Sequence, residues 1–132
     1  MLYNKQNSYD ENLRLSATQD ITADANGKDA GGADIVLDMK NQKGQALMVN
    51  MAIAAAAATT NVTVYAESSD DNTFATGVFT DEVLNIVETA AVTAPKSYGP
   101  AGFVPKGRYV RIRFDWTSGS LTDATTWLST TK

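Results

Sequence analysis

Apolar and polar residues alternate with a period of two along much of the chain, which predicts β-strands rather than helices. The clearest case is YVRIRFDW, residues 109–116, in which arginine and aspartate separate the apolar residues Val110, Ile112, Phe114 and Trp116. The same alternation predicts strands within residues 34–40, 46–53, 61–68 and 122–130. Before residue 34 the chain is rich in Ala, Asp and Gly, and we expect at most one short strand there, around residues 19–23.

Two segments fit this pattern less well. Residues 54–58 are five consecutive alanines, and alanine has the highest helix propensity of the common residues. Because the run has no polar residues for an outer helix face and is followed by two threonines, we interpret residues 54–60 as the end of a strand and a short connection, with a single helical turn as the alternative. Residues 79–93 predict one or two strands with Leu84, Ile86 and Val92 facing the core, although residues 82–87 also fit a helical turn.

The three prolines of the chain lie at equal steps, at Pro95, Pro100 and Pro105. Proline has no backbone N–H and cannot donate a hydrogen bond to a sheet, so this segment cannot be a central strand. Three glycines are interspersed with the prolines. We therefore expect a long ordered loop here.

Seven or eight short strands, little helix and turn residues between them predict an all-β fold. Within that class we expect an antiparallel two-sheet β-sandwich that is jelly-roll-like, with an immunoglobulin-like arrangement as the alternative. There is no internal repeat and no interdomain linker, so residues 16–132 are expected to form one domain. Residues 1–15 are mainly polar and predict an N-terminal arm that becomes ordered against a partner.

The composition favours non-catalytic functions. The 132 residues include no histidine and no cysteine. The chain therefore lacks the commonest general base, the commonest metal ligand and any possible disulfide. It has no phosphate-binding loop and no calcium-loop spacing of acidic residues. We expect no enzyme activity, no cofactor and no metal.

Charge and hydropathy limit the kinds of partner that this chain is expected to bind. A net charge of −4 argues against a surface built to bind nucleic acid. No segment has the roughly 20 apolar residues that a membrane span needs, and the N-terminus lacks the apolar core of a signal peptide. We expect a chain made in the cytoplasm, with neither nucleic acid nor membrane as its partner.

One region of the chain is strongly basic. Residues 89–114 contain no acidic residue and five basic ones, Lys96, Lys106, Arg108, Arg111 and Arg113. On a strand, Arg111 and Arg113 would lie on the same face, about 7 Å apart. Two interpretations stay open: acids of a neighbouring strand neutralise this face, or the face binds an acidic partner through its planar guanidinium groups.

The two tryptophans suggest a different function. Trp116 continues the apolar face of its strand and is expected in the core, whereas Trp127 lies on the face opposite Ala124 and Leu128. An exposed Trp127 could stack on a sugar ring, and the structural interpretation of the same position is the core or a subunit interface. The alternative function is therefore a carbohydrate- or receptor-binding β-sandwich module of a virion or cell-surface assembly.

Three short motifs follow one another along the chain. They consist of Ser16, Ala17 and Gln19; of Ser69, Asp70, Asp71 and Phe74; and of Pro105, Gly107, Arg108, Tyr109 and Arg111. In type, order and spacing they resemble the capsid cement or decoration proteins of tailed bacteriophages, in particular the jelly-roll group of short-tailed phages. The resemblance spans nearly the whole chain. It departs from the family pattern after the final turn, where Asp123 and Ala124 stand in place of an expected glycine.

The resemblance implies a non-enzymatic virion protein, made in the host cytoplasm, on the outer surface of a capsid. Such a protein binds the major capsid protein and cements neighbouring capsomers. The resemblance further implies a homodimer, with a trimer as the alternative. Together with the residue pattern, it makes Tyr3, Tyr9, Arg108, Arg111 and Arg113 the candidate partner contacts.

Overall fold

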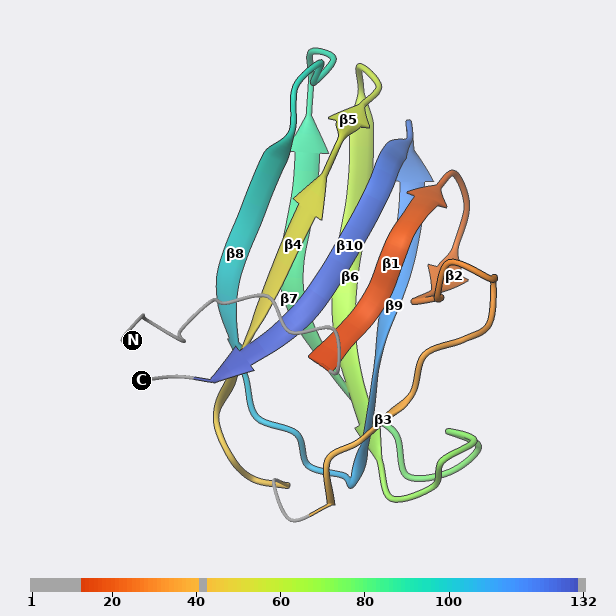
Figure 1. Ribbon diagram of the computed structural model, residues 1–132, viewed down its shortest axis with the longest axis vertical. Helices are drawn as coiled ribbons and strands as arrows, with labels where there is room; N and C mark the ends of the chain where they lie inside the picture. The colour runs from red at the N-terminus through yellow and green to blue at the C-terminus, as the bar shows by residue number, and fades with distance from the viewer. Residues whose placement is uncertain (1–12, 41–42, 131–132) are drawn as a thin grey trace.

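The computed structural model describes residues 13–40 and 43–130, which form two antiparallel β-sheets packed face to face (Figure 1). The strand order in sheet A is β1 (Arg14–Ile21), β10 (Leu121–Thr130), β4 (Leu47–Ile53) and β8 (Lys96–Phe103), and β5 (Ala55–Ala56) also pairs with β10. The order in sheet B is β2 (Ala25–Asn26), β9 (Tyr109–Ser118), β6 (Thr60–Ser69) and β7 (Phe79–Glu88), and β3 (Leu37–Asp38) also pairs with β9.

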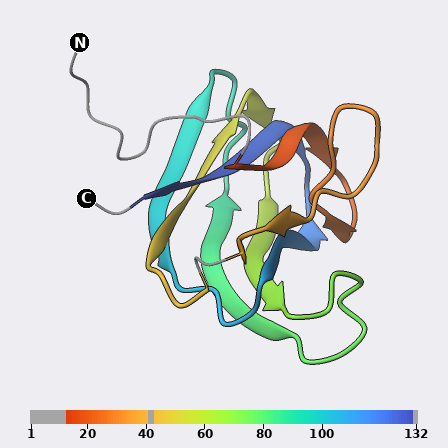
Figure 2. The ribbon, with the colours of Figure 1, turned by 60° about the horizontal axis from the view of Figure 1, so that its bottom comes forward.

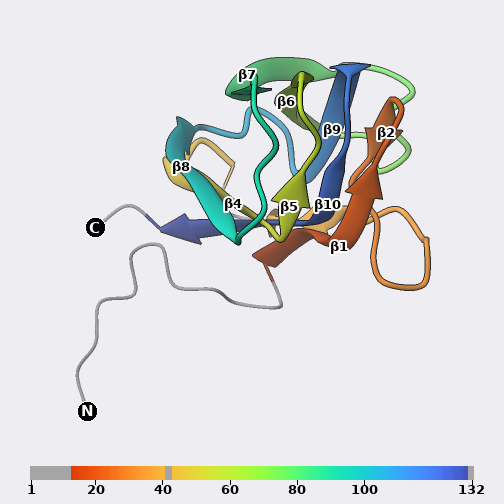
Figure 3. The same ribbon diagram turned by 90° about the horizontal axis from the view of Figure 1, so that it is seen from above.

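The strands pair as nested hairpins. β6 pairs with β7, β4 with β8, β2 with β9 and β1 with β10. When this long hairpin is rolled up, strands from the two ends of the chain become neighbours in both sheets, which is the jelly-roll topology. Figure 3, a view from above, shows the two sheets as separate layers. The predicted class, an antiparallel two-sheet sandwich of jelly-roll type, is confirmed.

The inward faces of the two sheets form one hydrophobic core. Its fully or almost fully buried members include the alternating residues of three predicted strands, namely Leu47, Val49, Met51, Ile53, Val62, Val64, Val110, Ile112 and Phe114. Burying a side chain of this size stabilises the fold by about 1.5–3 kcal/mol. The period-two pattern of the sequence therefore locates most of the core correctly.

β1 begins earlier and is longer than the short strand predicted around residues 19–23. Irregular pairing hides its alternation, because its register with β10 shifts three times and Thr18 has a φ of 44°. Leu15 is nevertheless fully buried. The expected boundary between arm and domain, after residue 15, thus falls inside a core strand.

The proline-containing segment is an edge strand, and the prediction of a long loop there is wrong. β8 pairs only with β4 and lies at the margin of sheet A, where a proline in the strand is tolerated. Residues 99 and 100 form a bulge opposite Asn50, because the register shifts between Val49 and Met51. The expectation that this segment is not a central strand is confirmed.

The ambiguous segments resolve as strands and turns. β4 ends at Ile53, the alanine run adds only the two-residue β5, and β6 begins at Thr60, while residues 79–88 form the single strand β7. Both helical alternatives are therefore wrong. Residues 34–40 supply only the two-residue β3, although Met39 is buried. Asp123 is one of the two residues that stand in place of the glycine expected from the resemblance. It has a φ of 54°, which aspartate tolerates better than most residues.

Candidate interaction surface

The outer face of sheet B, which points away from sheet A, carries Arg111 and Arg113 on β9. The neighbouring strand β6 places Glu67 directly opposite Arg111 in the ladder. Arg111 Nε donates to Glu67 Oε1 at 2.8 Å, and Arg113 Nε donates to Glu67 Oε2 at 3.1 Å. One carboxylate thus binds both arginines of the predicted cationic stripe.

Aromatic rings cover the two guanidinium groups. Arg111 lies over Phe74 at 4.3 Å from the ring centroid, and Arg113 lies over Tyr65 at 4.5 Å. Stacking of this kind stabilises a cation on a ring face and uses the planar shape of arginine. Because the side chain of Arg111 is 21 % exposed and that of Arg113 is 35 % exposed, both keep some contact with water.

Glu67 holds this cluster together and was not singled out from the sequence. Burial alone would raise the pKa of its carboxyl, but the hydrogen bonds and charges of Arg111 and Arg113 outweigh burial and hold the pKa below its ordinary value. The sequence leaves two interpretations of the basic residues open. For Arg111 and Arg113 the structure agrees with the first, in which an acid of a neighbouring strand neutralises their charge. The sequence does contain a signal for Glu67: it is the only acid in the predicted strand at residues 61–68, and it is at an outward position.

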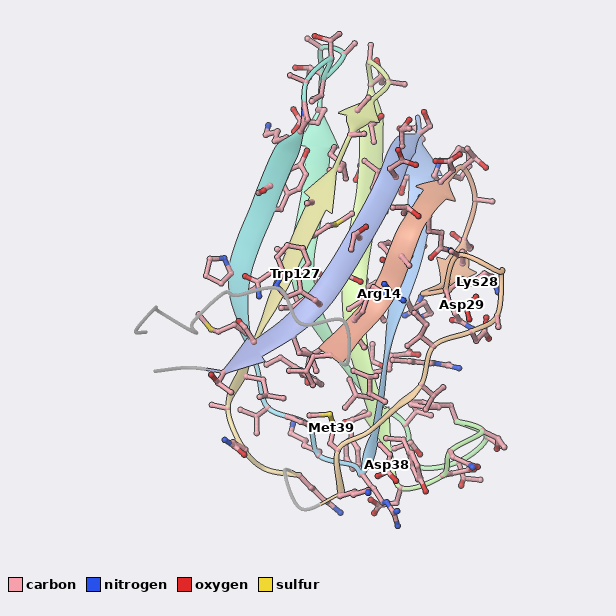
Figure 4. The ribbon with its side chains drawn as sticks, in the orientation of Figure 1. Arg14, Lys28, Asp29, Asp38, Met39 and Trp127 are labelled. Atoms are coloured by element: carbon pink, nitrogen blue, oxygen red, sulfur yellow. The ribbon has the colours of Figure 1, made fainter. Side chains whose placement is uncertain are left out.

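Arg108 forms a separate pair at the lower end of the sandwich. Its Nε and Nη2 donate to the two carboxylate oxygens of Asp38, at 2.7 and 2.8 Å. Figure 4 shows Asp38 at this end, beside Met39. The hydrogen bond from Arg108 lowers the pKa of Asp38 to about 2. Half of the Arg108 side chain is exposed, so Arg108 is the most accessible of the three candidate arginines.

The lowered pKa values of Glu67 and Asp38 allow a prediction of how the stability of the fold depends on pH. A carboxyl whose pKa is lower in the folded state stabilises the fold above its unfolded pKa, and this contribution is lost as the pH falls through its folded pKa. For Glu67 and Asp38 the ordinary values are 4.5 and 3.8. No histidine is present to titrate above them.

We therefore expect the free energy of unfolding to be constant between about pH 5.5 and 7 and to fall steadily below about pH 4.5. Urea titrations at a series of pH values would measure it. Unchanged stability at pH 3, or a step between pH 5.5 and 7, would contradict this assignment of the carboxylates.

The loop at residues 70–78, between β6 and β7, folds around Asp71. Its Oδ1 accepts hydrogen bonds from the backbone N–H and hydroxyl of Thr73, and its Oδ2 accepts one from the backbone N–H of Ala75. This arrangement turns Phe74 back under Arg111, where only 8 % of Phe74 is exposed. Figure 2 shows the loop in light green at the lower right. The motif of residues 69–74 thus builds a rigid loop.

The second and third motifs contact each other. Asp70 Oδ1 accepts a hydrogen bond from the backbone N–H of Arg108 at 3.0 Å. Gly107 lies so close to Ser69 that an added Cβ would come within 2.4 Å of backbone atoms of Ser69. Pro105 is also buried in this junction, and its carbonyl accepts a hydrogen bond from the N–H of Gly44. The second and third motifs of the resemblance therefore join two segments of the chain at one end of the sandwich.

The first motif has a comparable role in sheet A and its connection to sheet B. Ser16 Oγ donates to the carbonyl of Ala124 and accepts from the N–H of Thr126, which ties β1 to β10. Gln19 donates to the carbonyl of Asn26 and accepts from the N–H of Lys28. These contacts compensate for the irregular register of β1.

The remaining candidates lie elsewhere. Tyr3 and Tyr9 fall outside the residues that the structure describes. Trp116 packs against the core and its indole N–H donates to the carbonyl of Gly119, as expected for a structural residue. Trp127 is half-buried on the outer face of sheet A (Figure 4). The structure therefore brings Arg111 and Arg113 together and leaves Arg108 and Trp127 at separate places.

The surface offers shallow hollows. Two of them have volumes of about 420 and 390 Å³; Phe79 lines the first, and Asp81 and Glu82 of β7 line the second. Over residues 13–40 and 43–130, no group of three or more His, Cys, Asp or Glu side chains is placed to hold a metal ion. In the same part of the chain no helix is long and apolar enough to cross a membrane.

Comparisons with known proteins add no relative. No protein-family model matches the chain, and neither the curated proteins nor the solved structures include a significant match.

Proposed function

We propose that this chain is a structural virion protein that binds the outer surface of a bacteriophage capsid and cements neighbouring capsomers without catalysing a reaction. One observation carries the proposal: the three motifs behind the family resemblance occupy structurally demanding positions of a jelly roll. The first ties β1 to β10, and the other two contact each other through Ser69 and Gly107. The step from shared architecture to shared use is an analogy with the decoration proteins.

The physical properties of the sandwich suit this role. A capsid presents many copies of the same seam, so a rigid module that binds several subunits weakly gains in overall affinity through multivalency. The partner is then the major capsid protein, and the module itself is a homodimer or a trimer. Of the three candidate arginines, Arg108 stays the best candidate contact because half of its side chain is exposed.

Sedimentation with shells tests the proposal. Purified protein is expected to sediment with undecorated shells assembled from the major capsid protein that is its proposed partner, to saturate at a fixed number of copies per shell, and to raise the temperature at which the shells open. Shells of an unrelated head protein serve as the control. Absence from the shell pellet at saturating protein would contradict the proposal, and saturable glycan binding that Trp127→Ala abolishes would favour the carbohydrate-binding alternative.

A further inference from the structure

β7 is the longest strand at a sheet margin in the described part of the chain, and it contains no proline, although its register with β6 shifts once, at Val83. It has ten residues and pairs only with β6, so its other side presents backbone N–H and C=O groups without a strand beside them (Figure 3). At the other margins, β8 contains Pro100 and a bulge, β1 has an irregular register, and β2 and β3 have two residues each. An open edge of this length is a template for another strand.

Exposed apolar side chains lie on β7 and close to it. The described residues expose five large apolar side chains, and four of them, Val78, Phe79, Val87 and Val104, lie on or near β7. Val104 shares the 390 Å³ hollow with Asp81 and Glu82 of β7. Apolar exposure next to an open edge marks an interaction surface more strongly than either feature alone.

The sequence of β7 is complementary to itself. Its register with β6 shifts at Val83, so that the outward-facing residues are Thr80 and Glu82 before the bulge and Asn85 and Val87 after it. When two copies of β7 overlap completely in antiparallel register, a two-fold axis passes between Val83 and Leu84. Thr80 then lies opposite Val87 of the second copy, and Glu82 lies opposite Asn85.

This register matches outward residues with outward residues and places no two like charges directly opposite each other. A shift of the register by one residue would pair outward positions with inward ones. Asn85 can donate its amide hydrogens to the carboxylate of Glu82 across the seam. Because the axis repeats each contact, the interface contains this pair twice.

We propose that two copies of this chain pair antiparallel along β7 and join their B sheets into one continuous sheet. The inference rests on β7 itself and does not depend on capsid binding. Both proposals therefore fail or succeed in separate experiments.

Opposite charge changes at Asn85 test the pairing. Asn85→Glu places two carboxylate pairs opposite each other and is expected to raise the dimer dissociation constant by about tenfold, whereas Asn85→Lys creates two opposite-charge pairs and is expected to leave it unchanged or lower it. Asn85 is exposed, so both variants should keep the fold, which circular dichroism would verify. Sedimentation equilibrium measures the dissociation constants.

The double variant Glu82→Lys with Asn85→Glu places opposite charges across the seam and is expected to restore the dimer. A wild-type chain that stays monomeric at its highest soluble concentration would overturn the proposal. So would a dimer that Asn85→Glu and Asn85→Lys affect equally, or one that neither variant affects. Binding to shells by a monomeric chain would overturn the pairing and leave capsid binding intact.

Discussion

Replacing Glu67 by glutamine is expected to lower the free energy of unfolding by about 2–3 kcal/mol. Glu67 is 5 % exposed and is the carboxylate that both Arg111 and Arg113 bind. Without its charge, two neighbouring cations lose their shared partner and repel each other. Removing one partner of a fully buried pair costs more, but here both guanidinium groups keep some contact with water and the loss is smaller.

Asp115→Asn is the matched control. Asp115 is on the same strand as the two arginines and on the same outer face, opposite Thr63 of β6. It forms no ion pair with another residue that the structure describes. Its replacement is expected to change stability by less than about 0.5 kcal/mol. Urea unfolding of both variants measures the difference. Equal losses, or no loss for Glu67→Gln, would show that the cluster does not stabilise the outer face of sheet B.

Replacing Gly107 by alanine is expected to cost about 2–4 kcal/mol, because the new methyl group meets the backbone of Ser69, which cannot rotate away. The Cβ would lie 2.4 Å from the N and C atoms of Ser69. Relief requires the segment at residues 104–108 to move away from β6. That movement would weaken the hydrogen bonds from Lys106 to Ser68 and from Arg108 to Asp70.

Gly102→Ala provides the comparison within the same stretch of chain. A Cβ at Gly102 meets nothing within 4 Å, and alanine is favoured over glycine in a strand by about 0.5–1 kcal/mol. Gly102→Ala is therefore expected to be neutral or slightly stabilising. Thermal and urea unfolding of the two variants would separate them. A Gly107→Ala protein as stable as the wild type would mean that the two motifs are not tightly packed against each other.

The sequence predicts those parts of the fold that depend on local alternation. β4, β6 and β9 bury one face along most of their length, so their apolar residues recur at every second position and can be recognised without a structure. The alternation does not reveal β1, because the pairing of β1 with β10 is irregular. It does not reveal β8 either, because a proline excludes a central strand but is compatible with an edge strand.

At the candidate site, too, the sequence predicts what depends on the local pattern and misses what depends on contacts between distant residues. Period two places Arg111 and Arg113 on one face, and the structure confirms this placement. Their partner Glu67 is more than 40 residues earlier in the chain, and which outward residue faces which depends on the register between β6 and β9. The position of Phe74 under Arg111 depends further on the hydrogen bonds that Asp71 makes within its loop. Neither is visible in a local pattern.

A cryo-electron microscopy reconstruction of shells saturated with this protein tests the central claim most directly. The account predicts added density on the outer surface, with the size of a two-sheet sandwich, that bridges the seams between neighbouring capsomers. A reconstruction that is identical to that of bare shells would contradict it.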